Sequence, residues 1–350
     1  MNAARLLVST LTSFLLLGLL SFTGCKEEQG STGAQVGLQN AVLTTFYPTE
    51  YFAERIAGGL VIVDSPLPDG EDPIFWRPGA DAMNQYQNAK LVITNGAEFE
   101  KWVASAALPR GRTVQSVSEV ALEQAGGAIT METTTHSHGP GGEHTHEGID
   151  GHTWVSPQLA VMQARRIAEA MATAWPEHEG AFADNLERLE EDLDMLAASL
   201  RDLTPRMAEF RVFASHPAYN YLAREMGWSV TNLDLDPENS DTQGVVDAVH
   251  DALHHHEDHH HEHDHEHGHG DEHAEDHAHE HDHDHDHGHG DKPVLLLWEG
   301  EPTEAIENAL ASELGVTSVL FSPAESQPED GDYMDVMRGN IDRLRQAVGG

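Results

Sequence analysis

The sequence has 350 residues and a formal net charge of −41 at pH 7. This length suggests two domains of roughly 150 residues each, and the charge argues against nucleic acid or an anionic membrane surface as a partner. Residues 254–291 alone hold 14 of the 60 acidic residues. The charge balance indicates a soluble protein that attracts cations.

Residues 1–25 have the composition of a secretion signal. Arg5 precedes an apolar run over 6–22 that is too short and poorly flanked for a membrane-spanning helix. The run ends in small residues before Cys25, the only cysteine, which excludes an intramolecular disulfide. This segment resembles a bacterial lipoprotein signal in which Cys25 carries lipid. The alternative is an ordinary signal with an incidental cysteine. Residues 26–40 are polar and predict a flexible tether.

The folded part begins near Ala41 with alternating strands and helices. Strands are expected over 41–48 and 60–68 on either side of a helix over 49–58. A helix over 80–89 follows, and 90–103 reads as a strand, a glycine turn and a helix. This alternation predicts a parallel sheet, and ligands bind beyond the carboxyl ends of such strands. Four polar residues fall in loops of that kind: Glu71, Asp72, Asn95 and Glu98.

A histidine-rich loop is expected over residues 135–147. Two His-x-His pairs flank a Gly-Pro-Gly-Gly turn, which lets the chain double back so that both pairs could close on one cation. A solvated surface loop is an equally good interpretation. The histidines concerned are His136, His138, His144 and His146.

Two helices are predicted next, over 157–174 and 179–203. In the second, leucines recur at spacings of three and four, which indicates an apolar face packed inside the protein rather than a coiled coil with a partner. The strand–helix alternation then resumes. One strand ends at His216 with a helix behind it, and an apolar strand over 292–302 reaches Glu299.

The most unusual stretch is 254–289, in which half of the residues are histidine and nearly all others are Asp, Glu, Gly or Ala. It has no large apolar side chain to bury, so we expect a disordered insertion over 254–291. Its composition predicts metal binding, and a solvated acidic linker is the alternative. The accessory ligands proposed in it are His254, His255, His256, His259, His260, His261, His281, His283, His285 and His287.

Five segments in order resemble the substrate-binding lipoproteins of bacterial ABC importers for zinc and manganese. They are TTFYPTEYFAERIAG (44–58), LVITNGAEFEKW (91–102), GHTWVSP (151–157), ASHPAYNYL (214–222) and DYMDVMRGNIDRL (332–344). The resemblance implies an α/β fold of two lobes with mostly parallel sheets, bridged by a long rigid helix, with the metal between the lobes. The expected parts are an N-terminal lobe over 41–156, the bridge over 157–204 and a C-terminal lobe over 205–350.

The resemblance carries two metal ligands over, His152 and His216. The family's first histidine falls at Ile74, and its last aspartate falls at Ser322. Zinc needs about four donors, so Asp72 and Glu299 are the positional candidates for the rest, and histidines of 136–146 are the alternative. The segments DPIFWRP and HSHGPGGEHTH also resemble those of a subgroup of this family.

The resulting hypothesis is a non-enzymatic, monomeric lipoprotein, anchored to the membrane on its periplasmic or extracytoplasmic side. It would bind Zn²⁺, with Mn²⁺ less favoured because imidazole suits zinc, and pass it to an ABC permease and its ATPase. The histidine-rich tract would raise the local metal concentration. One alternative is a metal buffer or chaperone without a permease. A zinc metallohydrolase is a remote one, since there is no HExxH motif outside the histidine-rich tract and no nucleophile elbow.

Overall fold

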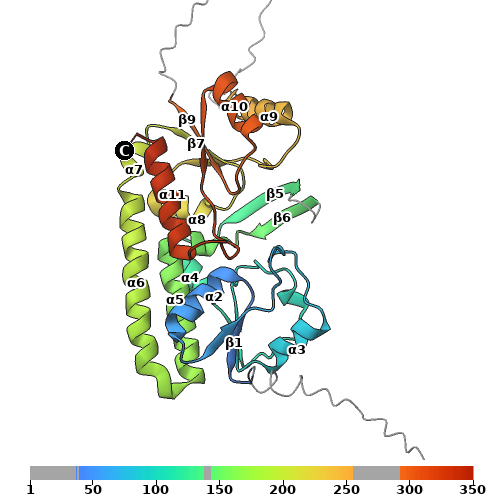
Figure 1. Cartoon of the computed structure of the whole chain (residues 1–350), viewed down its shortest axis with the longest axis vertical. Coiled ribbons are helices and arrows are strands. Elements are labelled where there is room, and N and C mark those ends of the chain that lie inside the picture. Colours follow the sequence, from blue (N-terminus) through green and yellow to red (C-terminus); the bar gives the residue numbers. More distant parts are fainter. Residues whose placement is uncertain (1–36, 38, 138–142, 255–291, 350) are drawn as a thin grey trace, which may run out of the picture.

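The computed structural model describes residues 37, 39–137, 143–254 and 292–349. In these ranges the chain forms two α/β lobes that lie one above the other beside a pair of long helices (Figure 1). The predicted fold class, two lobes with mostly parallel sheets, is confirmed. None of the helices in these ranges is long and apolar enough to cross a membrane.

Lobe 1 is built on a four-stranded parallel sheet in the order β2-β1-β3-β4. Its inner strands are buried along their whole length, as expected for a parallel sheet covered on both faces. The strands are β1 (Ala41–Thr44), β2 (Ile62–Asp64), β3 (Leu91–Thr94) and β4 (Thr113–Gln115). The helices are α2 (Tyr47–Ala57), α3 (Ala80–Asn88) and α4 (Glu119–Gln124).

Lobe 2 repeats this plan with the strand order β10-β9-β7-β8, also all parallel. Its strands are β7 (Arg211–Ala214), β8 (Val230–Asn232), β9 (Val294–Trp298) and β10 (Val316–Leu320). Its helices are α8 (Asn220–Met226), α9 (Thr242–His254), α10 (Glu304–Leu314) and α11 (Tyr333–Ala347). Counted along the chain, both sheets have the order 2-1-3-4. In each sheet the direction in which successive strands are added therefore changes between the first and the third strand. Ligands of such sheets bind beside that point.

Two antiparallel helices run alongside both lobes, α5 (Pro157–Ala174) and α6 (Glu179–Arg201), and the short α7 (Thr204–Met207) leads into lobe 2. The α6 helix packs against α2 of lobe 1 and α11 of lobe 2. Asp192 on α6 lies 2.6 Å from Arg55 of lobe 1 and 4.0 Å from Arg338 of lobe 2. Tyr333 of lobe 2 is fully buried against Phe52 of lobe 1, with ring centroids 5.2 Å apart. These contacts fix the lobes relative to each other.

The leucine face of α6 is buried as the spacing predicted. Leu193 is fully buried, and replacing it by alanine should lower the free energy of unfolding by about 2–5 kcal/mol, since the cavity sits where α6 meets the shared core. Urea unfolding measures this. Met195, two residues away and 57% exposed, gives the control: Met195→Ala should change stability by about 0.5 kcal/mol or less. Equal losses would mean that this face of α6 does not support the core.

The prediction of a helix within residues 90–103 is wrong. After β3 the chain turns with Ala97 and Glu98 at φ of 51° and 58°, and only a 3₁₀ turn, Val103–Ser105, follows. The buried Glu100 carboxylate accepts the Asn95 backbone N–H at 2.7 Å and the Thr45 hydroxyl. These hydrogen bonds to the Glu100 side chain hold the chain after β3 in a turn and compete with the backbone hydrogen bonds of a helix.

The histidine-rich segment over 135–147 also differs from expectation. It belongs to an antiparallel hairpin of β5 (Thr130–Ser137) and β6 (Glu143–Ile149), whose register pairs His136 with His144. Threonines dominate β5, and β-branched residues favour strands. Predictions for 1–25, including Cys25, for most of 26–40, for His138 and for the tract beyond His254 lie outside the described residues.

Candidate metal site between the lobes

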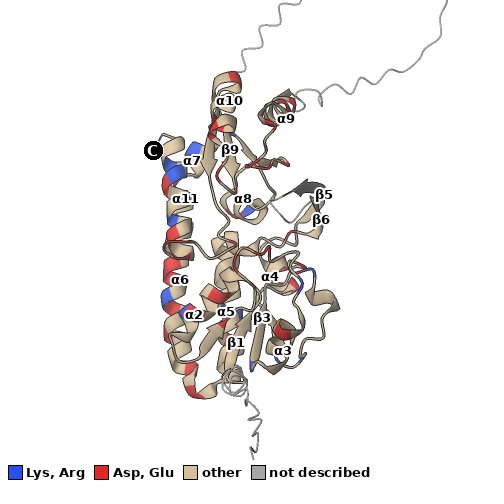
Figure 2. Ribbon diagram, turned by 45° about the vertical axis from the view of Figure 1, so that its right-hand side comes forward, with Lys and Arg blue, Asp and Glu red and all other residues tan. Residues whose placement is uncertain are grey.

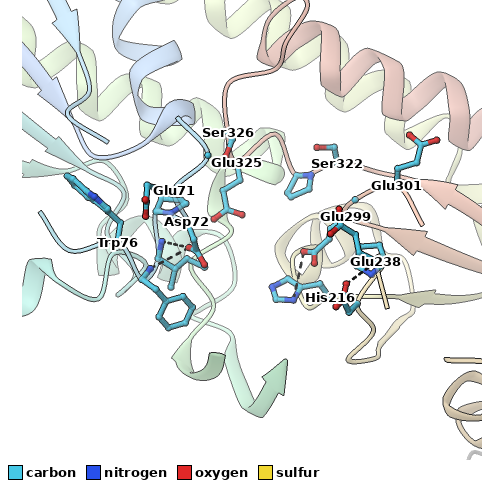
Figure 3. Close-up of a pocket in the computed structure, with 18 of the residues that line it drawn as sticks. Glu71, Asp72, Trp76, His216, Glu238, Glu299, Glu301, Ser322, Glu325 and Ser326 are labelled. Atoms are coloured by element: carbon cyan, nitrogen blue, oxygen red, sulfur yellow. Dashed lines mark hydrogen bonds and ion pairs between the residues drawn. The ribbon is translucent and has the colours of Figure 1, made fainter. Parts of the chain in front are cut away.

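A cleft of about 1170 Å³ opens between the lobes (Figure 3). Residues 70–77 line it from lobe 1, and loops after the strands of lobe 2 line it from the other side. Its lining includes a single Lys or Arg residue, Arg77, against a group of seven acidic ones: Glu71, Asp72, Asp236, Glu238, Glu299, Glu301 and Glu325. Acidic residues colour the loops between the lobes in Figure 2. Such a cleft attracts cations and repels anions.

His152 is 2% exposed, and its ring lies 5.4 Å from that of the cleft residue His216. Its Nδ1 is 2.8 Å from Asp150 Oδ1, which also accepts the His152 backbone N–H at 2.9 Å. The carboxylate holds the proton on Nδ1, so that Nε2 carries the lone pair that a metal needs. Burial lowers the pKa of His152, but Asp150 and the charges of Glu325 and Glu299 outweigh it and raise the pKa overall.

Asp150 also connects His152 to lobe 2. Its Oδ2 accepts a hydrogen bond from Asn220 Nδ2 at 2.9 Å, at the start of α8. On the lobe 1 side, Asn95 Nδ2 donates to the Gly151 carbonyl at 2.8 Å. The imidazole is therefore oriented by contacts from both lobes, which limits the movement of His152 before any metal arrives.

His216 and Glu299 come from neighbouring strands of lobe 2. His216 follows β7 and Glu299 follows β9. These are the two neighbouring strands between which the strand order of the lobe 2 sheet changes direction. His216 Nδ1 lies 3.9 Å from Glu299 Oε2, and the His152 and His216 rings are 5.4 Å apart. Three of the four predicted ligands thus lie close together, with His152 meeting the other two across the interface of the lobes.

Glu325, which sequence reasoning missed, faces the same cleft (Figure 3). It follows β10 by five residues, in a turn that Ser322 Oγ closes by accepting the Ala324 N–H at 3.2 Å. Trp154 Nε1 anchors this turn through the Pro323 carbonyl at 2.7 Å. Ser322 therefore supports the turn that presents Glu325. The available signal was an acidic residue three positions after Ser322, at the end of a parallel strand.

The two glutamates are strongly perturbed by this environment. Burial and the nearby Glu325 raise the pKa of Glu299 to about 8, against the opposing effect of His152. Burial raises the pKa of Glu325 to about 7, again against His152, with a contribution from Asp72. Each carboxylate is thus costly to ionise in the absence of a cation, and a bound divalent ion would remove that cost.

Asp72 lines the cleft from lobe 1, but one of its carboxylate oxygens accepts hydrogen bonds from the backbone. Its Oδ1 accepts the Ile74 N–H at 2.8 Å and the Phe75 N–H at 3.4 Å. Ile74 is 6% exposed and packs into the shared core. Where the resemblance implies a histidine ligand, this chain thus has a buried apolar side chain.

The site residues do not yet form a closed coordination sphere. Among the described residues no three His, Cys, Asp or Glu side chains stand close enough together to hold a metal ion. Instead, His216, Glu299 and Glu325 line the cleft, and His152 lies behind His216 with the two rings 5.4 Å apart. Two imidazole nitrogens and two carboxylate oxygens make a donor set of the kind that zinc takes.

Comparisons with known proteins agree with this architecture. The Zn(II)-bound ZnuA-like domain of Streptococcus pneumoniae AdcA has a similar fold, with a TM-score of 0.63 at 20% identity over 89% of this chain and 99% of that one. In sequence, the chain is 23% identical to the zinc-binding lipoprotein AdcA of S. pneumoniae over 97% of its own length but only 60% of that protein's. It is 28% identical to the high-affinity zinc uptake system protein ZnuA of Bacillus subtilis, over 65% of this chain and 70% of that protein.

A family model covers the centre of the chain. The model for ZnuA, the periplasmic component A of the zinc-uptake complex, matches residues 42–256, which include β1 to β8 and both buried histidines. The chain therefore belongs to the ZnuA family of periplasmic zinc-uptake components.

Proposed function

We propose that this protein captures Zn²⁺ between its two lobes and passes it to an ABC-type permease. The observation that carries the proposal is that His216, Glu299 and Glu325 line one acidic cleft and that the buried His152 ring lies 5.4 Å from His216. We propose these four side chains as the ligands, with Asp72 contributing charge from lobe 1. The glutamate side chains would rotate to complete the sphere.

Zinc fits this donor set better than manganese does. Two imidazole nitrogens suit Zn²⁺, whereas Mn²⁺ favours carboxylates, carbonyls and water. The relatives AdcA and ZnuA are described as zinc-binding and zinc-uptake proteins, which supports the same choice. The proposal also includes lipidation of Cys25 and an extracytoplasmic location. In it, the histidine-rich tract collects zinc and passes it to the cleft.

Competition against a chromogenic chelator tests the proposal. We expect one tight Zn²⁺ site per chain and Mn²⁺ binding at least about 100-fold weaker, because the imidazoles favour zinc. The tract would add weaker zinc sites. A set of weak sites without a tight one would overturn the proposal and favour a metal buffer.

Zinc binding should release protons near neutral pH. At pH 7 Glu299, with a pKa of about 8, is mostly protonated and Glu325, with a pKa of about 7, is half protonated. Both must lose their protons to bind metal. Calorimetry in buffers of different ionisation enthalpy should show more than one proton released per ion at the tight site, and Glu299→Gln should lower that number. A binding heat independent of the buffer would contradict the assignment.

The same shifts set the stability of the zinc-free protein. Both folded pKa values exceed the unfolded value of 4.5, so the native state binds more protons than the unfolded chain between pH 4.5 and 8. The free energy of unfolding of the zinc-free protein should therefore fall as pH rises through that window. Zinc should restore stability most at the alkaline end. Thermal unfolding at pH 6 and pH 8, with and without zinc, measures both effects.

A further inference from the structure

The end of α9 carries a histidine pair that lies apart from the cleft residues. The helix buries Val245, Val246 and Val249 in the core of lobe 2 and packs beside α10 (Figure 1). His250 and His254 occupy exposed positions beside the buried face, one helical turn apart.

The two rings are already close to each other. Their centroids lie 4.4 Å apart with planes inclined at 55°, as residues at positions i and i+4 of a helix permit. Two histidines at this spacing on one helix face can bind the same transition-metal ion. The Nδ1 of His250 is 3.6 Å from Asp251 Oδ1. A carboxylate on that side favours Nε2 as the metal-binding nitrogen.

The helix end is held in place rather than frayed. Arg211, at the start of β7, donates from Nη2 to the Leu253 carbonyl at 2.9 Å. Leu253 itself packs against the core of lobe 2. The carboxyl end of a helix also carries partial negative charge, which favours a cation there. The pair is thus pre-positioned on a fixed support.

We propose that His250 and His254 form a second, two-imidazole site for a divalent transition-metal ion such as Zn²⁺, on the surface of lobe 2. Among the described residues no third His, Cys, Asp or Glu joins the pair in a metal-binding group. Such a site binds more weakly than the cleft and exchanges its ion freely with solvent. It gives the protein a structured surface site at the start of the histidine-rich tract.

Hydrogen exchange of the full chain, with the cleft first loaded by one equivalent of Zn²⁺, tests this proposal. Further Zn²⁺ should slow exchange in the last turn of α9. At a free concentration ten times the dissociation constant of the pair, amides that open with the site should exchange about tenfold more slowly. His250→Gln should remove this protection while leaving the cleft site at full affinity.

A matched variant controls for histidine content. Ala248 is exposed on the same helix, so the double variant His250→Gln with Ala248→His keeps the number of histidines but places them six residues apart, on different faces. It should also lose the protection. Protection that persists in both variants would show that the tract alone binds the added metal and would overturn the proposal.

Discussion

Replacing His216 by alanine is expected to abolish tight zinc binding. His216 is 4% exposed and follows the end of β7 by two residues. It stands beside both Glu299 and His152. Removing a residue that hydrogen-bonds to a metal ligand typically lowers metal affinity by about 10–100-fold. Removing the ligand itself should therefore lower it by more than about 100-fold. Chelator competition measures the loss.

Two controls separate lost ligation from lost folding. Circular dichroism and thermal unfolding without zinc should show that the His216→Ala chain still folds. His178, at the amino end of α6, contacts Phe182 far from the cleft lining, so His178→Gln should leave zinc affinity unchanged. A folded His216→Ala protein that binds zinc at full affinity would remove this histidine from the site.

Replacing Glu325 by glutamine should weaken zinc binding by more than about 10-fold, because a neutral amide takes the place of a ligand carboxylate. Burial has already raised the pKa of Glu325 to about 7, so removing the charge should not destabilise the empty protein. Higher thermal stability of the zinc-free variant at pH 8, together with weaker zinc binding, is the expected combination.

Glu301 provides the matched control. It lines the same cleft but is exposed, so Glu301→Gln makes the same chemical replacement in the cleft without removing a proposed ligand. We expect its zinc affinity to fall by less than about threefold, the effect of a partly screened charge. Equal losses in the two variants would mean that Glu325 acts only through the field of the cleft.

Much of the fold could be predicted because its determinants are local. The buried strands β1, β3 and β9 are short apolar runs, and the leucine spacing of α6 reports a buried face. The turn after β3 could not be predicted, since it depends on the buried Glu100 carboxylate and its contact with Thr45, 55 residues away. The hairpin pairs strands whose sequence is mostly polar, so hydrophobic alternation gave no signal there.

The candidate site could likewise be predicted from the sequence only in part. Glu299 could be proposed from its place at a strand end, because parallel strands bring their carboxyl ends to one edge, whereas His152 and His216 were proposed from the family resemblance. Glu325 could not be proposed, since its place in the cleft depends on the turn that Ser322 closes and Trp154 anchors. The position of Asp72 was foreseen, but its engagement with the backbone of Ile74 was not.

The central claim is that tight binding belongs to the cleft and not to the histidine-rich tract. Leu253 and Pro293 both contact Arg211 through their carbonyls, at 2.9 Å each, so a short Gly-Ser linker can replace residues 255–291 without moving α9 or β9. Zinc titration of this shortened chain by calorimetry is the most direct measurement. One tight site per chain should remain, the weak sites of residues 255–291 should be lost, and only the weak pair His250 and His254 should persist beside the tight site. Loss of the tight site on deletion, with the site intact in full-length His216→Ala, would contradict the account.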